Sequence, residues 1–234
     1  MKGRSANPSF MLGAMYWLNP NRSYREIEKE IAAIRGNNLD IIRVFIWWEH
    51  LEKEEGVFDF SLYDMAFEAA SKHNVLVMGS FGFYLPFWLK RRLARKGIED
   101  TGRYYCLDRP EVQKLLGKYV DRTVARYKDS KALYSWNIWN EPTKLPCSCM
   151  HTRRKFVGWL KTKYGSIGRL KEAWLGESMV FNTVCPDSFD ELDCSWVDDA
   201  MRHGGRGRCT PLEYDLHEFS SDNLCENIGW LAGR

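Results

Sequence analysis

Short, strand-like apolar runs recur along the first part of the chain, separated by amphipathic stretches. The runs cover residues 10–18, 41–47, 75–81 and 133–139. Only Arg43 interrupts the second run, and a continuous apolar run is typical of a parallel strand that is covered on both faces. The four runs therefore predict four strands of one parallel sheet.

Amphipathic helices are predicted between these strands. A capping-box pair, Ser23 and Glu26, precedes a helix that ends near residue 36. A similar pair, Ser61 and Asp64, precedes a helix to about residue 73, and a third helix begins near Pro110. Between residue 81 and this third helix lies a long loop that is rich in aromatic and basic residues. The alternation of strands with helices predicts a parallel α/β fold.

The pattern changes after Trp139. Two helical stretches follow, each with one apolar stripe: Phe156, Trp159 and Leu160 in the first, and Ile167, Leu170 and Trp174 in the second. Residues 176–209 read as an irregular excursion, and a last helix is expected from Pro211, a residue that favours the first helical position. The chain thus has an inserted helical, cysteine-containing region after the fourth strand. No linker marks a domain boundary, so residues 1–234 are expected to form a single domain.

Charge does not suggest a polyanionic or membrane partner. The 34 basic and 31 acidic residues leave a net charge of +3, which is too balanced to predict binding to nucleic acid or to a membrane. No second basic stretch extends the one basic cluster, so a solvated helix or loop face is the favoured interpretation. That cluster consists of Lys90, Arg91, Arg92, Arg95 and Lys96.

The cysteines and the amino terminus favour the cytoplasm. Seven cysteines are an odd number in a chain large enough to fold without disulfides, which fits a reducing compartment. The apolar stretch at residues 10–18 has no small-residue cleavage site after it, so export is not indicated.

The sharpest chemical motif is Asn140-Glu141-Pro142, directly after the fourth predicted strand. Catalytic groups of parallel α/β barrels lie at the carboxyl ends of strands. A carboxyl group among Trp136 and Trp139 is expected to be partly desolvated, which raises a carboxyl pKa toward the range of a general acid. The alternative is a Glu that braces the loop ahead of a proline turn.

Several segments, in the same order, resemble the family 42 β-galactosidases, which are glycoside hydrolases of clan A. The segments are residues 13–17 (GAMYW), 40–48 (DIIRVFIWW), 55–60 (EGVFDF), 85–89 (LPFWL), 159–165 (WLKTKYG) and 170–174 (LKEAW). Enzymes of this clan are (β/α)8 barrels in which an Asn-Glu pair ends the fourth strand. The resemblance therefore implies the amino-terminal half of such a barrel, with about four βα units, in an apparently truncated catalytic domain.

The resemblance also implies roles for individual residues. Glu141 would be the acid/base of a retaining glycosidase, and Asn140 would bond the sugar 2-hydroxyl. Arg43 would lie beneath the catalytic carboxylates; its structural alternative is a paired core arginine. Arg103 lies where the family has substrate-contacting arginines, although the local match is inexact. Candidates for a sugar platform are Trp47, Trp48 and Trp88, for each of which core packing is the alternative.

Three cysteines resemble part of the four-cysteine zinc site of this family. They are Cys106, Cys147 and Cys149, and the fourth position of the pattern falls on Thr152, a poor zinc ligand, with His151 as a neighbouring substitute. A closed thiolate site would be structural, and the alternative is three reduced thiols packed near a loop. No organic cofactor is expected. The other cysteines, which show no ligand spacing, are Cys185, Cys194, Cys209 and Cys225.

The second carboxylate of a retaining glycosidase is not assigned here. In the family it follows the seventh strand, and this chain reaches the helix after the fourth, so these residues alone are expected to be inactive. Within the clan, arabinosidase, mannanase and β-glucanase specificities stay open beside hydrolysis of β-galactosides. A half-barrel that binds carbohydrate without catalysis is the alternative class, and two unpaired sheet edges favour association with a partner or a second copy as a homo-oligomer.

Overall fold

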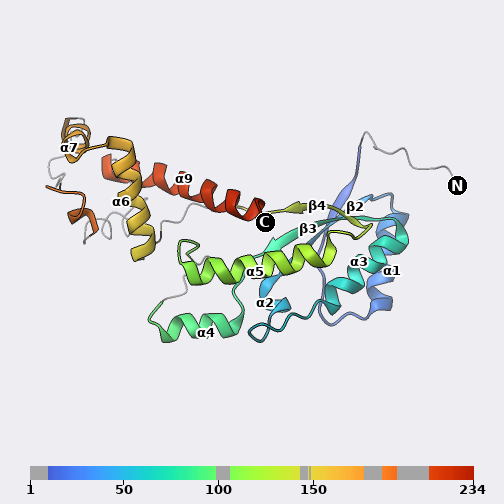
Figure 1. Cartoon of the computed structure of the whole chain (residues 1–234). Helices are drawn as coiled ribbons and strands as arrows, with labels where there is room; N and C mark the ends of the chain where they lie inside the picture. The colour runs from blue at the N-terminus through green and yellow to red at the C-terminus, as the bar shows by residue number, and fades with distance from the viewer. Residues whose placement is uncertain (1–9, 99–105, 143–146, 148, 177–185, 194–210) are drawn as a thin grey trace. The chain divides into compact units, whose positions relative to one another are not determined.

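The computed structural model of the chain describes residues 10–98, 106–142, 147, 149–176, 186–193 and 211–234 (Figure 1). The chain divides into two compact units. The sheet unit takes in residues up to 103, residues 116–141 and Arg234, and the helical unit takes in residues 104–115 and 142–233.

The sheet unit is built on four strands in the order β1-β2-β3-β4, all parallel. The strands are β1 Gly13–Tyr16, β2 Ile41–Trp47, β3 Leu76–Gly82 and β4 Leu133–Asn137. Strands that are neighbours in the sheet are consecutive in the chain, with helical crossovers between them, as expected of successive βα units. The predicted parallel α/β fold with four strands is therefore confirmed.

Helices cover one side of this sheet (Figure 1). They are α1 Tyr24–Gly36, α3 Ser61–His73 and α5 Pro110–Tyr127, with the shorter α2 Trp48–Leu51 and α4 Phe87–Arg95. Helix α1 begins with the predicted capping box: the Ser23 side chain accepts from the Glu26 amide, and the Glu26 carboxylate accepts from the Ser23 amide at 2.9 Å. Helix α4 was not predicted and occupies part of the expected loop.

The start of α3 differs from the prediction. Ser61 is the first helical residue and not the cap; the residue before it, Phe60, makes no side-chain cap bond. Instead the Asp59 carboxylate accepts from the Ser61 amide at 2.9 Å. A carboxylate bonds a helix-start amide more strongly than a hydroxyl does, so Asp59 takes the role that the pattern assigned to Ser61.

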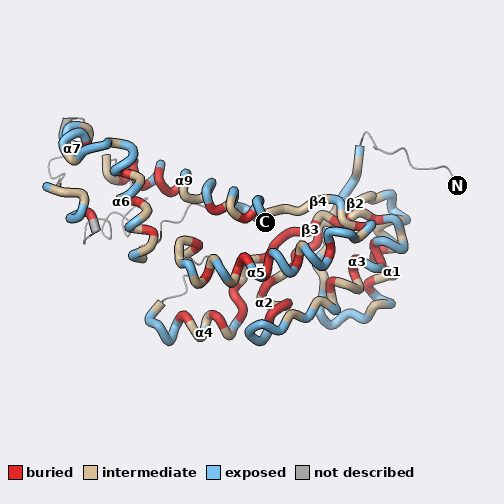
Figure 2. The backbone as a smooth tube through the Cα atoms, viewed as in Figure 1, coloured by how far each residue is buried: buried red, intermediate tan, exposed pale blue. Residues whose placement is uncertain are grey.

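Alternate residues of β2 divide between the two faces of the sheet. Ile42, Val44 and Ile46 have no exposed surface, whereas Arg43 and Trp47 are half-buried. Because side chains of a strand alternate between its faces, the first set packs on the helices and the second set lies on the opposite face. Figure 2 shows buried residues as red stretches along the strands and along α5.

The helical unit has its own core. Its elements are α6 Met150–Tyr164, α7 Ile167–Gly176, a short 3-10 helix Glu191–Asp193 and α9 Pro211–Ala232. The core consists of Phe156, Leu160, Leu170, Trp174, Leu192, Leu216 and Phe219. Both predicted apolar stripes contribute to it, and the last helix begins at Pro211 as predicted. Most of the excursion predicted at 176–209 lies outside the described residues.

Within the described part of the chain, every helix is too short or too polar to cross a membrane.

Candidate functional site

Arg43 of β2 connects three neighbouring segments on the open face of the sheet. Its Nε donates to Ser80 Oγ on β3 at 2.7 Å, and its Nη2 donates to the Oδ1 atoms of Asn137 and Asn140, each at 2.9 Å. The guanidinium also lies 4.7 Å from the centre of the Phe45 ring. Among the described residues its hydrogen-bond partners are neutral, so the half-buried positive charge is not offset by a carboxylate there. The structure thus brings Arg43 together with Asn140, and the role of Arg43 beneath the catalytic carboxylates stays a prediction.

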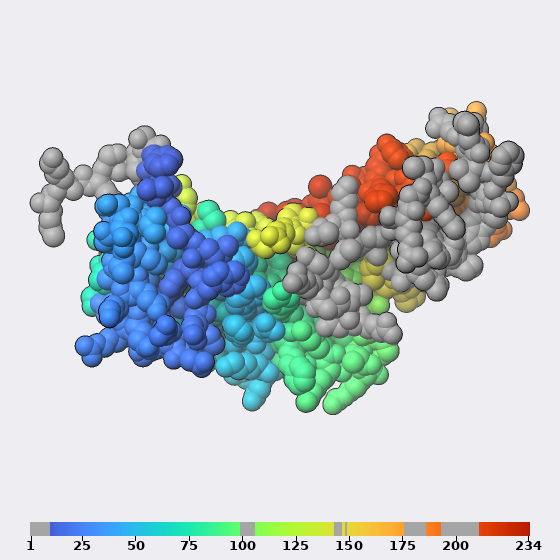
Figure 3. Space-filling model, turned by 180° about the vertical axis from the view of Figure 1, so that it is seen from behind, coloured from blue at the N-terminus to red at the C-terminus, as the bar shows by residue number. Residues whose placement is uncertain are grey.

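Glu141 follows Asn140 at the carboxyl end of β4. Its backbone has φ 48°, in the left-handed region that residues other than glycine seldom adopt. Strained backbone of this kind clusters at functional sites. Figure 3 shows the segment at the end of β4, in yellow, reaching the molecular surface. Glu141 is exposed, so the expected partial desolvation of this carboxyl among tryptophans is wrong for this chain.

Four aromatic rings form a continuous stack near the carboxyl ends of β1, β2 and β3. Trp17 stacks on Phe45 with ring centres 5.4 Å apart, Phe45 on Trp47 at 5.0 Å, and Trp47 on Tyr84 at 5.0 Å, all nearly parallel. Trp17 is 64% exposed, which leaves one end of the stack open to solvent. We call these four residues the aromatic stack.

The other two platform candidates have different environments. Trp48 has no exposed surface, stacks on Tyr119 and donates its Nε1 to Glu52 at 2.7 Å, so it is a core residue and not a sugar platform. Trp88 is half-buried and donates to the backbone oxygen of Glu52 at 2.9 Å. The sequence pattern selected Trp47 but missed its partners Trp17, Phe45 and Tyr84, because an aromatic residue in or beside an apolar run looks like core.

The basic cluster lies on α4 and just after it. Arg91 and Arg95 are exposed, and Arg92 pairs with Glu55. This agrees with the favoured interpretation as a solvated helix face. Arg103 lies outside the described residues.

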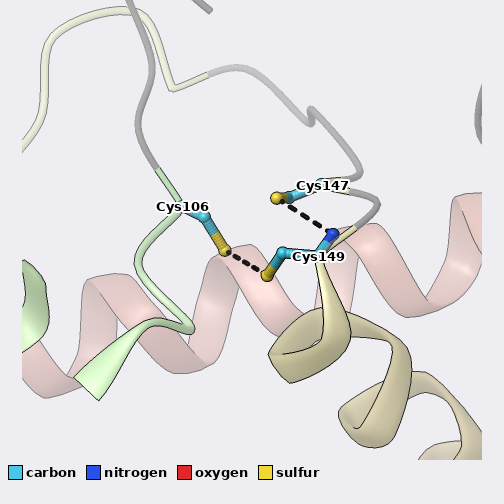
Figure 4. A group of neighbouring side chains, drawn as sticks. All are labelled: Cys106, Cys147 and Cys149. Atoms are coloured by element: carbon cyan, nitrogen blue, oxygen red, sulfur yellow. Dashed lines mark hydrogen bonds between the residues drawn. The ribbon is translucent and has the colours of Figure 1, made fainter. Parts of the chain in front are cut away.

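In the helical unit, Cys106, Cys147 and Cys149 come together. Their sulfur atoms all lie within 4.8 Å of one another, and Figure 4 shows the Cys106 and Cys149 side chains meeting from the segment before α5 and from the start of α6. The Cys106 and Cys149 sulfurs are 3.5 Å apart, and Cys147 Sγ accepts from the Cys149 amide at 3.4 Å. The predicted cysteine cluster is confirmed as a cluster.

Hydrogen bonds among these three thiols shift the pKa values of Cys106 and Cys149 in opposite directions. Hydrogen bonds with Cys147 and Cys149 raise the pKa of Cys106, whereas the hydrogen bond with Cys106 lowers the pKa of Cys149 well below its ordinary value. The cluster therefore favours one thiolate, on Cys149, that its neighbours stabilise. A site that concentrates thiolate character is suited to a soft divalent cation.

The fourth position of the cysteine pattern, Thr152, lies in the same cluster. Its side chain is buried, and its Oγ1 is 3.1 Å from Cys106 Sγ and 3.5 Å from Cys149 Sγ. His151 is half-buried and, among the described residues, is not one of those whose ligand atoms gather within 4.8 Å.

Asp108 is a residue that the sequence did not single out. Its carboxylate is 3% exposed and accepts from Thr152 Oγ1 at 2.6 Å, from Asn223 Nδ2 at 3.0 Å and from Asn227 Nδ2 at 3.5 Å, and it pairs with Lys155 at 3.1 Å. It thus ties the segment of Cys106 to α6 and α9. One hint in the sequence was that Asp108 lies two residues after Cys106. A search for the spacing of cysteines does not consider aspartates, so this hint was passed over.

Of the remaining cysteines, Cys225 is an exposed free thiol on α9. The others, Cys185, Cys194 and Cys209, lie outside the described residues.

Comparison with known proteins identifies the family. The model of glycoside hydrolase family 42, described as β-galactosidase, matches residues 17–191, which is more than half of the chain. The chain belongs to glycoside hydrolase family 42. The matched span includes Arg43, Asn140, Glu141 and the cysteine cluster.

Individual relatives agree with this family. The chain is 31% identical over 215 residues to β-galactosidase Bga of Halorubrum lacusprofundi, which covers 86% of this chain and 29% of that protein. It is 30% identical over 177 residues to β-galactosidase LacZ of Lactobacillus acidophilus, covering 70% of this chain and 26% of that protein. The chain therefore spans less than a third of the length of these relatives.

A solved structure shows the same fold. The β-galactosidase from the Antarctic haloarchaeon Halorubrum lacusprofundi matches with a TM-score of 0.74 and 26% identity, over 93% of this chain and 33% of that one. Together with the four parallel strands in consecutive order, this likeness confirms the predicted amino-terminal half of a (β/α)8 barrel in this member of family 42.

Proposed function

We propose that these residues form the acid/base half of a retaining glycosidase that hydrolyses terminal β-galactosides. Glu141 protonates the glycosidic oxygen and then activates the water that releases the sugar. Residues 1–234 act as one part of a single catalytic domain. The supporting observation is the hydrogen bond from Arg43 to Asn140, which holds the residue next to Glu141.

This hydrogen bond also decides which group Asn140 offers to a sugar. Because the Asn140 Oδ1 accepts from Arg43 at 2.9 Å, its Nδ2 is the donor that it presents to a ligand. A donor at this place suits the oxygen of the sugar 2-hydroxyl, and such a contact strengthens in the transition state. The aromatic stack supplies a flat apolar surface for a sugar face, with Trp17 as its most accessible ring.

The second carboxylate comes from outside these 234 residues. A retaining mechanism needs two carboxyl groups about 5–5.5 Å apart, and the family resemblance assigns the nucleophile to a later strand. Arg43, with its neutral partners among the described residues, is placed to stabilise such a carboxylate.

Two measurements on the 234-residue chain test this proposal. Titration calorimetry is expected to detect galactose binding, stronger than that of arabinose, mannose or glucose, and Asn140→Ala is expected to weaken it at least tenfold. An aryl β-galactoside is expected to show no turnover above the blank. Equal binding of all four sugars would contradict the specificity, and turnover that Glu141→Gln abolishes would contradict the missing nucleophile.

We also propose that Cys106, Cys147 and Cys149 hold a structural zinc ion. Zinc–sulfur bonds of 2.3 Å in a tetrahedral site place the sulfurs about 3.8 Å apart. The Cys106 and Cys149 sulfurs, 3.5 Å apart, fit this spacing, and all three sulfurs lie within 4.8 Å of one another. When bound, the ion would cross-link the segment before α5 to the start of α6. The reduced cluster fits a cytoplasmic protein.

Metal content tests the zinc proposal directly. The purified chain is expected to carry close to one zinc per molecule, and the double variant Cys106→Ser, Cys149→Ser none. Less than a few tenths of a zinc per chain after supplementation would overturn it.

A further inference from the structure

The Thr152 hydroxyl oxygen lies beside two of the three clustered sulfurs, those of Cys106 and Cys149. For zinc, bond lengths of 2.3 Å to sulfur and 2.0–2.2 Å to oxygen give a sulfur–oxygen edge of about 3.6 Å. The Thr152 Oγ1 is 3.1 Å from Cys106 Sγ and 3.5 Å from Cys149 Sγ, close to that edge. We infer that the Thr152 hydroxyl oxygen is the fourth ligand of the metal site, with Asp108 holding it in place. This inference rests on the proposed zinc site.

The hydrogen bonds at Thr152 leave its oxygen suitably oriented. Its hydroxyl hydrogen is donated to Asp108 Oδ2 at 2.6 Å. A hydroxyl has one hydrogen and two lone pairs, so the lone pairs of the Thr152 oxygen point away from the Asp108 bond, and Cys106 Sγ lies 3.1 Å from this oxygen. Metal binding releases the thiol protons to solvent, while the hydrogen bond to Asp108 persists and makes the oxygen a better electron donor.

Asp108 is held firmly enough to position the hydroxyl. Besides Thr152, its oxygens accept from Asn223 at 3.0 Å and pair with Lys155 at 3.1 Å, from helices α9 and α6. Groups that hydrogen-bond a metal ligand fix its orientation and commonly alter metal affinity about 10–100-fold. Asp108 is thus a positioning residue for the metal ligand.

The neighbouring histidine is excluded by helix geometry. Thr152 and His151 both lie in the first turn of α6, which begins at Met150. Successive residues of an α-helix point about 100° apart around its axis. Because Thr152 points at the sulfurs, His151 is directed away from them. The consequence is a site with three sulfurs and one oxygen, which holds zinc less tightly than four thiolates.

Titrations with Zn²⁺ and with Co²⁺ as a spectroscopic probe test this assignment on the full 234-residue chain. Thr152→Val keeps the shape of the side chain and removes the hydroxyl, so it is expected to weaken metal affinity about 10–100-fold. Thr152→Ser is expected to retain most of the affinity. Thr162→Val is the matched control, because Thr162 is exposed on the same helix and its hydroxyl donates to the Gly158 carbonyl oxygen at 3.1 Å, away from the cysteine cluster.

Two further variants make the result independent of any loss of folding in Thr152→Val. Thr152→Cys is expected to bind zinc more tightly than wild type and to increase the sulfur-to-cobalt absorption by about one third, from three thiolates to four. His151→Ala is expected to leave affinity and spectrum unchanged. Circular dichroism of each variant confirms its helix content.

The outcomes separate this inference from the zinc proposal. If wild type binds neither metal, the zinc site fails and the inference fails with it. If wild type binds metal but His151→Ala weakens binding while Thr152→Val does not, the zinc site stands and the role of Thr152 is overturned.

Discussion

Arg43 donates a 2.9 Å hydrogen bond to the side-chain oxygen of Asn140, which joins the middle of β2 to the loop that follows β4. Arg43 is a charged residue in an otherwise apolar strand, and this contact explains its place there. The residue after Asn140 is Glu141, whose backbone turns through the left-handed region. The position of the proposed acid/base therefore depends on a contact made by a strand two places away in the sheet.

Replacing Arg43 by Lys tests this dependence. Lysine keeps the charge but loses the planar fork that bonds Ser80, Asn137 and Asn140 together. Loss of hydrogen bonds from a charged donor is expected to lower the free energy of unfolding by about 1.5–3 kcal/mol in urea denaturation. Arg126→Lys is the control, because this half-exposed arginine pairs with Asp64 at the surface, where an ion pair contributes little, and its effect is expected to be clearly smaller than that of Arg43→Lys. Equal effects of the two variants would contradict the structural role of Arg43.

Gly79→Ala tests the packing of β3 on β4. A Cβ atom at Gly79 would overlap the ring of Trp136. Overpacking of this kind is expected to cost about 1–3 kcal/mol in urea denaturation. The matched control is Gly36→Ala at the end of α1, where nothing lies within 4 Å and alanine is expected to stabilise by about 0.4–1 kcal/mol. Alanine is thus expected to lower the free energy of unfolding at position 79 and to raise it at position 36. A change of the same sign at both positions would contradict the packing of Gly79 on Trp136.

The sheet could be predicted from the sequence because each strand is a continuous apolar run between amphipathic helices. Strand β2 matches its predicted bounds, Ile41–Trp47. Helix α4 was missed because its aromatic and basic residues obscure a helical stripe, of which Leu89 and Leu93 are the buried members. The spacing of apolar residues predicts a helix only where the residues of the stripe outnumber the aromatic and basic residues that interrupt the pattern.

Some of the candidate functional residues could be predicted from the sequence, and others could not. The motif at Asn140 and Glu141 and the spacing of the cysteines are local, so the sequence suffices to select them. Asp108 and Trp17 are defined by contacts with residues far along the chain, such as Asn223 and Phe45. Partners that only the tertiary structure brings together leave no periodic or motif signal.

Ser23→Ala tests the capping box of α1 and its pH dependence. Hydrogen bonds from Ser23 lower the pKa of Glu26 to about 2. A lowered pKa in the folded state means that this stabilisation is present above the unfolded pKa of about 4.3 and is lost as the pH falls toward 2. The variant is expected to cost about 1 kcal/mol at pH 7.

Urea denaturation at pH 7 and pH 2.5 measures this effect. The difference between wild type and Ser23→Ala is expected to shrink at the lower pH. Ser71→Ala, at an exposed position inside α3, is expected to change little at either pH. A difference between wild type and Ser23→Ala that stays constant with pH would contradict the role of the Glu26 carboxylate.

Asp215→Ala tests the core of the helical unit. The buried Asp215 carboxylate accepts from Trp174 Nε1 and Tyr164 Oη, each at 2.8 Å, and from Lys163 at 2.9 Å. Its removal leaves the buried Trp174 donor and the half-buried Tyr164 hydroxyl without this acceptor, while Lys163 keeps its partner Glu218. The loss is expected to cost about 1–3 kcal/mol for each of the two donors, followed by tryptophan fluorescence during unfolding. Asp222→Ala is the control, since Asp222 accepts from Trp159 near the surface at 2.8 Å and its loss is expected to cost about 1 kcal/mol. Similar losses in both variants would show that burial at Asp215 is unimportant.

The proposed role of Glu141 is tested most directly by binding of a positively charged sugar analogue. A basic, galactose-configured iminosugar mimics the charge of the oxocarbenium-like transition state, whereas galactose is neutral. Calorimetry on the 234-residue chain is expected to show that Glu141→Gln weakens binding of the iminosugar about five- to tenfold, the effect of roughly 1 kcal/mol of charge attraction in a solvated site. Galactose binding is expected to change less than twofold. An iminosugar affinity that is the same in wild type and Glu141→Gln would contradict the assignment of Glu141 as the carboxylate that acts on the glycosidic bond.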